Sequence, residues 1–282
     1  MLPASTMAAT DGPKRKRDTL DRKLVEQVAG LLAHAGSALF ITGAGLSADS
    51  GLPTYRGIGG LYDGHPTIEG YPIETVLSGQ MLATRPELTW RYLLEIEASA
   101  RHARFNRGHE ILARIEERLP RVVVLTQNVD GFHRAAGSKN VIAIHGDLHD
   151  LRCTACSWRH TVENFAGLTA PPGCPVCGAL VRPDVVLFGE PLPDVAMERL
   201  EAEVARGFDI VFAVGTTAQF PYIARPVLIA RSEGVPTIEI NPDTTELSDV
   251  VDIRLPSTAK HALRAIWNVF KGLSVQATRL GR

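Results

Sequence analysis

Two Cys-x-x-Cys pairs constrain the fold of this chain more than any other feature of its sequence. Cys153 and Cys156 form the first pair, Cys174 and Cys177 form the second, and 17 residues lie between the pairs. Four thiolates in this arrangement can converge on one Zn²⁺ and leave it no open coordination position. We therefore expect a zinc ribbon over residues 147–183, in which a single Zn²⁺ has a structural role.

Cysteine usage also indicates a compartment. All four cysteines of the 282-residue chain belong to the two pairs, so none is left for a disulfide framework. Metal-binding thiols are typical of reducing compartments, whereas secreted proteins use paired cysteines for disulfides. We expect a cytoplasmic, intracellular protein.

Charge and hydropathy argue against several other classes. Lys and Arg total 30 against 31 Asp and Glu, a formal net charge of -1, so no global basic field attracts nucleic acid or anionic membrane. No segment approaches the roughly 20 apolar residues of a membrane-spanning helix, and residues 1–18 lack the apolar core of a signal peptide. We expect no membrane association and no direct nucleic-acid binding. The basic run 14–17 is interpreted as part of a flexible, solvated N-terminal tail over residues 1–18.

Short apolar runs recur along the chain and alternate with helical patterns. A helical face over about residues 20–35 ends at Gly36, which we expect to cap that helix. Two segments interrupt the alternation, namely residues 56–106, rich in turns and then in aromatic residues, and the cysteine segment. The alternation predicts an α/β fold in which parallel strands are joined by crossover helices. The predicted buried strands are residues 38–41, 122–125, 141–144, 210–214 and 237–240.

A glycine-rich turn follows the first predicted strand. Residues 43–48 (GAGLSA) fit G-x-G-x-x-A, where missing side chains let backbone N–H groups approach a pyrophosphate at a helix N-terminus. No acidic residue ends an evident second strand about 20 positions on, where a dehydrogenase would hold the ribose. Hydride transfer is therefore not favoured. The polar loop 49–57, with Tyr55 and Arg56, instead offers an aromatic face and a guanidinium beside the phosphates.

Polar side chains follow two further predicted strands, at the edge where open α/β sheets bind ligands. Gln127, Asn128 and Asp130 come directly after residues 122–125. Their grouping favours a ligand pocket, and the alternative for Asp130 is an N-cap of the next helix. His145 ends another predicted strand, where a neutral imidazole can take a proton near pH 7.

The order and spacing of these motifs resemble the sirtuins, NAD-dependent protein lysine deacylases, over roughly residues 20–270. The resemblance implies a Rossmann-like parallel sheet with helices on both faces, plus a small lobe of zinc ribbon and helical insertion. The acyl-lysine would enter the cleft between the lobes. The resemblance rests on residues 43–56, 126–130, 145–146, the cysteine pairs, 183–190, 215–217 and 240–241. The corresponding division is a large domain of residues 19–55, 107–146 and 184–272, a cofactor loop and insertion over 56–106, and the ribbon over 147–183.

The resemblance also implies a reaction and roles for single residues. In the family's chemistry the acyl oxygen attacks the ribose C1′ as nicotinamide leaves, and a histidine deprotonates a ribose hydroxyl that attacks the resulting imidate. The products are free lysine, nicotinamide and O-acyl-ADP-ribose. His145 would be the general base, Asn128 would join it in catalysis by shaping the nicotinamide pocket, and Gln127 would hold the ribose. The co-substrate NAD⁺ would be contacted by Gly43, Ala44, Gly45, Ser47, Asp49, Tyr55, Arg56, Gln127, Asn128, Val129, Asp130, Gly215, Thr216, Thr217, Asn241, Pro242 and Ala259. A strand made of Val185, Val186, Leu187, Phe188, Gly189 and Glu190 would pair with the substrate peptide.

The chain departs from the family pattern in three places. Tyr55 replaces the commoner phenylalanine, Asp147 stands where a small polar residue is usual, and residues 215–220 differ from the usual Gly-Thr-Ser continuation. The third difference affects the segment that would contact the adenosine half of NAD⁺.

The helix of the insertion bears on the acyl group. In the subgroup that removes succinyl or malonyl groups this helix supplies a Tyr and an Arg, and here Leu93 and Ile96 take those places. A buried carboxylate without an arginine is costly, so we expect a neutral acyl group, acetyl first.

Two other functions stay open from the sequence. The same ribosyl intermediate would permit transfer of ADP-ribose to protein. In a non-enzymatic alternative, the ribbon would contact nucleic acid and the glycine turn would sense NAD, but the near-zero net charge disfavours this. As partners we expect acyl-lysine proteins or peptides, and we expect the protein to be a monomer.

Overall fold

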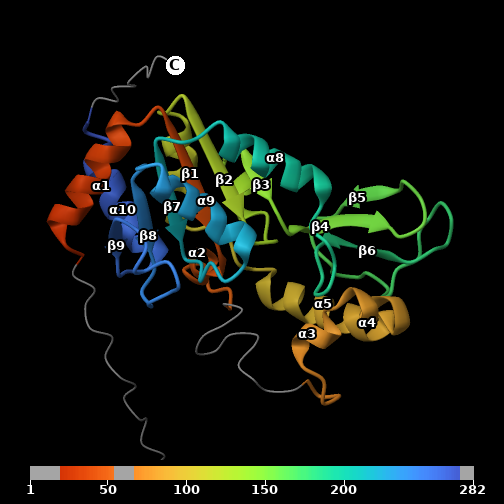
Figure 1. The fold of residues 1–282 in the computed structure, drawn as a ribbon. Helices are drawn as coiled ribbons and strands as arrows, with labels where there is room; N and C mark the ends of the chain where they lie inside the picture. The colour runs from red at the N-terminus through yellow and green to blue at the C-terminus, as the bar shows by residue number, and fades with distance from the viewer. Residues whose placement is uncertain (1–19, 54–66, 274–282) are drawn as a thin grey trace, which may run out of the picture.

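The computed structural model describes residues 20–53 and 67–273. The predicted N-terminal tail with its basic run, and the loop residues Tyr55 and Arg56, lie outside the described residues. The described chain forms two lobes that lie side by side (Figure 1). Each lobe is built around a sheet of its own.

The larger lobe contains a six-stranded parallel sheet. Its strands are β1 (Ser37–Thr42), β2 (Arg121–Thr126), β3 (Val141–Ala143), β7 (Ile210–Val214), β8 (Thr237–Ile240) and β9 (Ile253–Leu255). They are hydrogen-bonded in the order β3-β2-β1-β7-β8-β9, and each neighbouring pair is parallel. The strand order reverses at β1, so the crevice outside the carboxyl ends of β1 and β7 is the position at which such sheets bind ligands.

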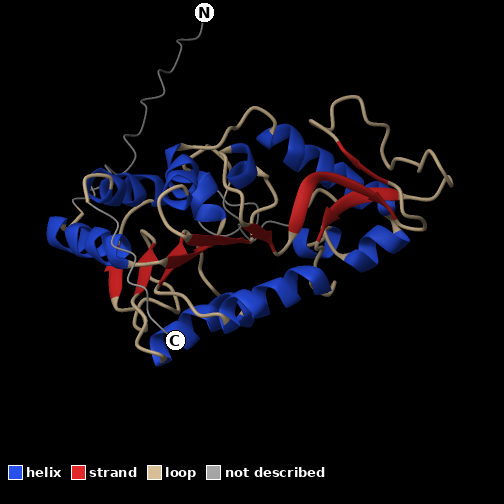
Figure 2. Cartoon of the chain, turned by 90° about the horizontal axis from the view of Figure 1, so that it is seen from above, coloured by secondary structure: helices blue, strands red, loops and turns tan. Residues whose placement is uncertain are grey.

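Helices cover both faces of this sheet (Figure 2). Successive side chains of a strand point to opposite faces, so Phe40 of β1 stacks on Phe212 in one core while Leu39 and Ile41 belong to the other. The predicted α/β class, with helices on both faces, is confirmed. One face carries α1 (Arg22–His34), α6 (Arg107–Glu116) and α10 (Ala259–Phe270), and the other carries α8 (Asp194–Ala205) and α9 (Pro221–Ser232).

The first helix ends earlier than its sequence pattern predicts. Asp21 caps its start by accepting a hydrogen bond from the Lys23 backbone N–H. The helix stops at His34, and Ala35, with extended backbone angles, is the C-cap, so the predicted cap at Gly36 is wrong. The Gly36 N–H donates instead to Asp209 Oδ2 at 2.9 Å, which turns the chain directly into β1.

The smaller lobe joins two segments that are far apart in the sequence. Its antiparallel sheet has the order β5-β4-β6. Trp90 is fully buried between the two segments, where its indole N–H donates to the Val181 carbonyl at 3.0 Å and its ring packs on Phe165. The predicted small lobe of zinc ribbon and helical insertion is therefore confirmed. Its elements are α3 (Ile73–Val76), α4 (Gly79–Thr84), α5 (Pro86–Ala100), β4 (Gly146–Cys153), β5 (Arg159–Thr161) and β6 (Val181–Val185).

None of the helices in residues 20–53 and 67–273 combines the length and the apolar character that a bilayer crossing requires.

Candidate active site

Two glycine turns pack against each other at the reversal point of the sheet. The first leads from β1 into the short helix α2 (Ala44–Ala48), and the second follows β7. The Gly45 N–H donates to the Gly215 carbonyl at 2.9 Å, and a Cβ on Gly45 would lie 2.8 Å from Gly215 Cα. A Cβ on Gly43 would lie 2.7 Å from the same carbonyl oxygen. Glycine is therefore required at both positions for the turns to meet, whatever ligand they hold.

A hydrogen-bond network joins the first glycine turn to the loop after β2. The Asn128 amide Nδ2 donates to the Gly43 carbonyl and to Ser47 Oγ, both at 3.0 Å. Ser47 Oγ in turn donates to Asp130 Oδ2. Residues from two separate motifs, Ser47 of the glycine turn and Asn128 and Asp130 of the loop after β2, are thus brought into contact beside the reversal point.

Asp130 has two structural roles. Its second carboxylate oxygen accepts the Phe132 backbone N–H at 3.0 Å, at the start of α7 (Phe132–Ala135). The N-cap residue of α7 is Gly131, so the N-cap alternative for Asp130 is wrong, and its role in a ligand pocket stays a prediction. Burial raises the pKa of the Asp130 carboxyl, and the hydrogen bond from Ser47 opposes that rise.

The adenosine side of the predicted site shows similar contacts. Gln127 Nε2 donates to Thr216 Oγ1 at 2.8 Å, and Asn241 Nδ2 donates to the Thr216 carbonyl at 3.1 Å. Thr217 and Pro242 are exposed nearby in the chain. These contacts connect the ends of β2, β7 and β8.

Three predicted cofactor residues have contacts that their motifs did not indicate. Asp49 Oδ2 accepts the Lys260 backbone N–H at 2.8 Å, so it caps the start of α10. Ala259, the first residue of that helix, is buried in the core. Val129 packs against the core of the smaller lobe, and its carbonyl accepts the Leu148 N–H.

His145 is held as a neutral imidazole with a defined tautomer. Its Nδ1 lies 2.9 Å from the Gln127 carbonyl oxygen, an acceptor, so Nδ1 carries the hydrogen and Nε2 carries the lone pair. Nε2 lies 2.7 Å from the hydroxyl of Tyr222. Burial lowers the pKa of His145, against the opposing effect of the Gln127 carbonyl. A neutral ring near pH 7 suits a general base.

Two aromatic side chains beside His145 were not singled out from the sequence. Phe220 and Tyr222 stack with ring centroids 5.5 Å apart, and each meets the imidazole edge-on. Their one sequence signal is the departure of residues 215–220 from the family pattern. That departure gave no indication of a contact with His145, which lies 77 residues earlier.

The predicted substrate-pairing segment is only partly a strand. Val185 ends β6, but residues 186–190 are not regular strand, so that part of the prediction is wrong. Their backbone groups are used elsewhere, because the Val186 N–H donates to the His145 carbonyl and the Phe188 N–H donates to the Leu77 carbonyl. Gly189, with φ +79, then turns the chain.

A buried ion pair fixes the same segment. Arg182, 4% exposed, binds both carboxylate oxygens of Glu190 and the Val185 carbonyl. Glu190 also accepts the Leu187 N–H at 2.9 Å. Arg182 was not among the predicted site residues, although it fixes the loop that carries Phe188.

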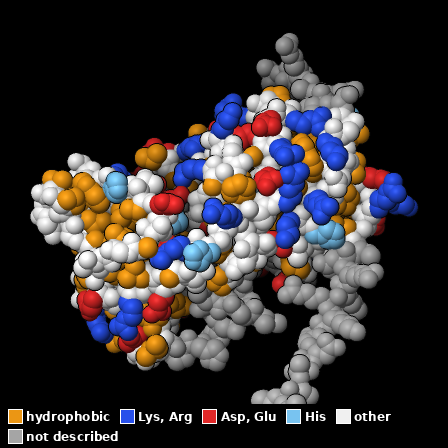
Figure 3. Space-filling view, turned by 180° about the vertical axis from the view of Figure 1, so that it is seen from behind, with side chains coloured by type: hydrophobic (Ala, Val, Ile, Leu, Met, Phe, Trp, Pro, Cys, Tyr) orange, Lys and Arg blue, Asp and Glu red, His pale blue; other side chains and the backbone are white. Residues whose placement is uncertain are grey.

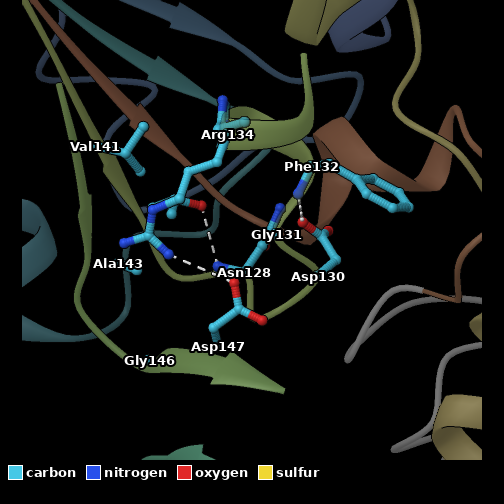
Figure 4. Close-up of a pocket in the computed structure, with 11 residues that line it drawn as sticks. Asn128, Asp130, Gly131, Phe132, Arg134, Val141, Ala143, Gly146 and Asp147 are labelled. Atoms are coloured by element: carbon cyan, nitrogen blue, oxygen red, sulfur yellow. Dashed lines mark hydrogen bonds and ion pairs between the residues drawn. The ribbon is translucent and has the colours of Figure 1, made fainter. Parts of the chain in front are cut away.

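A small pocket lies beside Asn128 and Asp130 (Figure 4). Arg134 and Asp147 approach each other across it, with Arg134 Nη1 3.5 Å from Asp147 Oδ2. Asp147 also accepts the His149 backbone N–H at 3.1 Å. The unusual aspartate after His145-Gly146 therefore stabilises the start of β4.

The four cysteines form a site that fits one tetrahedral zinc ion. Their Sγ atoms all lie within 4.8 Å of one another. Two of the Sγ pairs, Cys153/Cys177 and Cys156/Cys174, are 3.5 and 3.7 Å apart. A tetrahedron with Zn–S bonds of about 2.3 Å has edges of about 3.8 Å. The Ala155 N–H donates to Cys153 Sγ and the Val176 N–H donates to Cys174 Sγ, and such hydrogen bonds favour the thiolate form of a ligand.

Two buried histidines, His109 and His133, lie close to the site, and neither belongs to a motif singled out from the sequence. His109 is fully buried and His133 is 2% exposed, with ring centroids 5.0 Å apart. Desolvation lowers the pKa of His109 to about 4, and desolvation together with His109 lowers the pKa of His133 to about 3. Thr42 Oγ1 lies 2.9 Å from His133 Nε2, so this pair connects β1 to α6 and α7.

This pair predicts a loss of stability in mild acid. The unfolded chain binds protons below about pH 6.5, whereas the buried rings stay neutral until about pH 4 and about pH 3. The stability that depends on the two neutral rings is therefore fully present above about pH 6.5, and it is lost as the pH falls toward the pKa values of the folded protein. Between pH 7 and pH 5 we expect about 2 kcal/mol of unfolding free energy to be lost per histidine.

Urea unfolding at pH 7 and at pH 5 tests this prediction. The quantity compared between the wild type and a variant is the unfolding free energy that each protein loses between the two pH values. In His133→Gln the loss between pH 7 and pH 5 should be about 2 kcal/mol smaller than in the wild type. The same substitution at the exposed His102 is the matched control and should leave the loss unchanged. An equal pH dependence in all three proteins would contradict the assignment.

Leu93 and Ile96, on which the acyl-specificity hypothesis depends, both lie on the helix α5. Leu93 is 4% exposed in the core of the smaller lobe, and Ile96 packs against that core. The arginines of this region are already paired, since Arg91 binds Glu69 and Arg101 binds the buried Glu97.

Comparisons with known proteins agree with this arrangement. A protein-family model described as the Sir2 family matches residues 43–221. The NAD-dependent protein deacylase 2 of Pseudomonas aeruginosa is 50% identical over 238 residues, which cover 83% of this chain and 93% of that protein.

Solved structures are similar over most of the chain. A mutant Sir2 homologue in complex with 2′-O-acetyl ADP-ribose is 34% identical, with a TM-score of 0.79, covering 91% of this chain and 99% of that one. A Sir2 complex with a p53 peptide and NAD⁺ is 28% identical, with a TM-score of 0.74, covering 86% and 96%.

Proposed function

The chain belongs to the Sir2 family and is an NAD-dependent protein deacylase, and from this premise we propose that it removes neutral acyl groups, acetyl first, from protein lysine side chains. NAD⁺ supplies the ribosyl group that accepts the acyl oxygen as nicotinamide leaves. The products are free lysine, nicotinamide and O-acyl-ADP-ribose. The observation that carries this proposal is the neutral His145 beside the joined ends of β1, β2 and β7.

The residues divide into a base and a binding surface. We assign His145 as the general base, because its Nδ1–H is fixed by a backbone carbonyl and its Nε2 carries a lone pair. Asn128 and Asp130 shape the nicotinamide pocket, which their shared contacts with Ser47 support. The remaining cofactor residues predicted from the sequence, Tyr55 and Arg56 included, keep their proposed roles in binding NAD⁺.

The peptide is proposed to enter between the lobes, along residues 185–190. The backbone bond from Val186 to His145 places this segment next to the base, and the Arg182–Glu190 pair holds it rigid. A neighbour of known structure is a complex with a p53 peptide, which supports a peptide substrate here.

The preference for a neutral acyl group is testable on α5. An acetyl-lysine peptide should show a kcat/KM at least about tenfold above the same peptide bearing succinyl-lysine, because an unpaired buried carboxylate costs more than 1.4 kcal/mol. The variant Ile96→Arg should lower the ratio of kcat/KM for the acetyl peptide to kcat/KM for the succinyl peptide. Ala98→Arg, which adds the same single positive charge at an exposed position two residues further along the helix, should leave it unchanged. A wild-type preference for succinyl would overturn this assignment.

Product analysis tests the proposed reaction itself. The protein is incubated with NAD⁺ and acetyl-, succinyl- and long-acyl-lysine peptides, and the products are identified by mass spectrometry. Acetyl-lysine loss with formation of O-acetyl-ADP-ribose and nicotinamide is expected. A peptide that gains ADP-ribose instead would favour the transferase alternative, and zinc-loaded, folded protein that acts on no peptide would refute the proposal.

We further propose that the protein is a cytoplasmic monomer that does not bind nucleic acid. Four free thiols at one metal site support a reducing compartment. On the face shown in Figure 3, Lys and Arg side chains lie mainly over the larger lobe, among acidic residues, rather than on the ribbon. The two separate sheets support a division into a large domain and a smaller lobe, and the sheet of the smaller lobe extends just beyond residues 147–183, because Gly146 pairs with Val185.

A further inference from the structure

The hydroxyl of Tyr222 lies where the general base must act. A neutral imidazole has one lone pair in the ring plane, and here it is on Nε2 because Nδ1–H is bound to the Gln127 carbonyl. The Tyr222 hydroxyl, 2.7 Å away, is therefore the donor to that lone pair. Burial raises the pKa of Tyr222 to about 12, so the hydroxyl keeps its proton throughout the working range of pH.

The chain holds this tyrosine firmly. Tyr222 is the second residue of α9, and its ring stacks on Phe220 with an interplanar angle of 14°. Ala218, with φ +52, makes the preceding turn and donates its N–H to Thr216 Oγ1. A left-handed non-glycine residue is costly, so the surrounding contacts must fix this turn.

No described charge faces the imidazole to compete with this contact. The groups against His145 are the Gln127 carbonyl, the Tyr222 hydroxyl and the Phe220 ring. The carboxylates of the neighbouring loops are engaged elsewhere, Asp130 by Ser47 and Asp147 by Arg134.

We propose that Tyr222 is a positioning residue for His145: its hydroxyl caps Nε2 before substrates bind, keeps the ring neutral and aimed, and yields the lone pair to the ribose hydroxyl during the reaction. The proposal rests on the proposed role of His145 as the general base. Residues 215–220 differ from the family pattern, and the proposal gives a role to the tyrosine that follows them, because it contacts a residue 77 positions earlier in the sequence.

Tyr222→Phe isolates the hydroxyl, because phenylalanine keeps the ring that stacks on Phe220. A hydrogen bond donated to Nε2 stabilises the neutral imidazole, so its loss should raise the pKa of His145. One such bond corresponds to a rise of about half to one pH unit. NMR titration of His145 in the ligand-free protein measures this shift, with Tyr71→Phe as the matched control.

Tyr222→Phe should also change the pH dependence of deacylation, because the neutral ring is the base. The acid limb of kcat/KM for deacylation should move to higher pH by the same amount in Tyr222→Phe. As the pH is lowered, the ratio of deacylation to nicotinamide exchange should therefore begin to fall at a higher pH in Tyr222→Phe than in the wild type, because exchange precedes the base step. Equal His145 titration in wild type and Tyr222→Phe, with zinc content and unfolding midpoint unchanged, would overturn the inference. Because the NMR readout uses no substrate, that result is distinguishable from a failure of the deacylase proposal.

Discussion

Replacement of His145 by alanine is expected to lower the rate of deacylation by about 100-fold or more while nicotinamide exchange continues. A positioned general base contributes roughly 10²- to 10⁴-fold to a rate. His145 meets the structural requirements, with a fixed tautomer and a pKa lowered by burial. Attack of the acyl oxygen and departure of nicotinamide do not need this base, so labelled nicotinamide should still be incorporated into NAD⁺.

The two readouts together separate catalysis from folding. Wild type, His145→Ala and the exposed control His160→Ala are compared for acetyl-lysine loss and for nicotinamide exchange. The control should match the wild type in both. Loss of exchange and deacylation together in His145→Ala would mean that the imidazole maintains the binding site and is not the base. Undiminished deacylation would reject the assignment altogether.

The burial of His145 also determines how deacylation should depend on pH. The base acts as the neutral ring, so activity falls as the pH drops through the pKa of His145. Because burial lowers that pKa, the midpoint of the fall should lie below the ordinary histidine value of about 6.5. An acid limb centred above pH 7 would contradict the buried, neutral ring.

The sequence predicted the elements whose patterns are local. Each of the five apolar runs is a strand of the large sheet, because continuous burial on both faces demands uninterrupted apolar residues. The cysteine pairs converge because their short spacing leaves few other arrangements. Strand β9 was not predicted, because the charged Arg254 interrupts its apolar residues.

The contacts that the sequence did not predict join residues far apart in the chain. The Tyr222–His145 bond and the edge-on contact between His109 and His133 depend on how turns are folded, which residue spacing does not encode. Residues 186–190 were expected to be a strand from the family resemblance, yet their backbone groups bond to two different loops. Local pattern gave the scaffold and the motif residues, and tertiary packing decided their partners.

Removal of zinc is expected to unfold the ribbon and, with it, the smaller lobe. Four thiols packed within 4.8 Å of one another would then lack the cation that holds them together. Structural zinc contributes about 10–16 kcal/mol in zinc-finger peptides at pH 7, which is comparable to the whole stability of a domain. Cys153 and Cys174 are also members of the core that contains Trp90 and Phe165, so opening the site opens that core.

Cys177→Ser tests coordination apart from packing, because Cys177 is the one exposed ligand of the four. Metal analysis should show less than one zinc per chain, and tryptophan fluorescence should show unfolding around Trp90 and Trp158 at lower urea than in the wild type. Ser157→Ala, an exposed neighbour that is not a ligand, is the matched control and should keep its zinc. The cores on both faces of the large sheet contain no ribbon residue from β4 or β5, so most of the helical circular dichroism should persist. Full activity and an unchanged fluorescence transition after complete chelation would show that zinc is not what holds this lobe together.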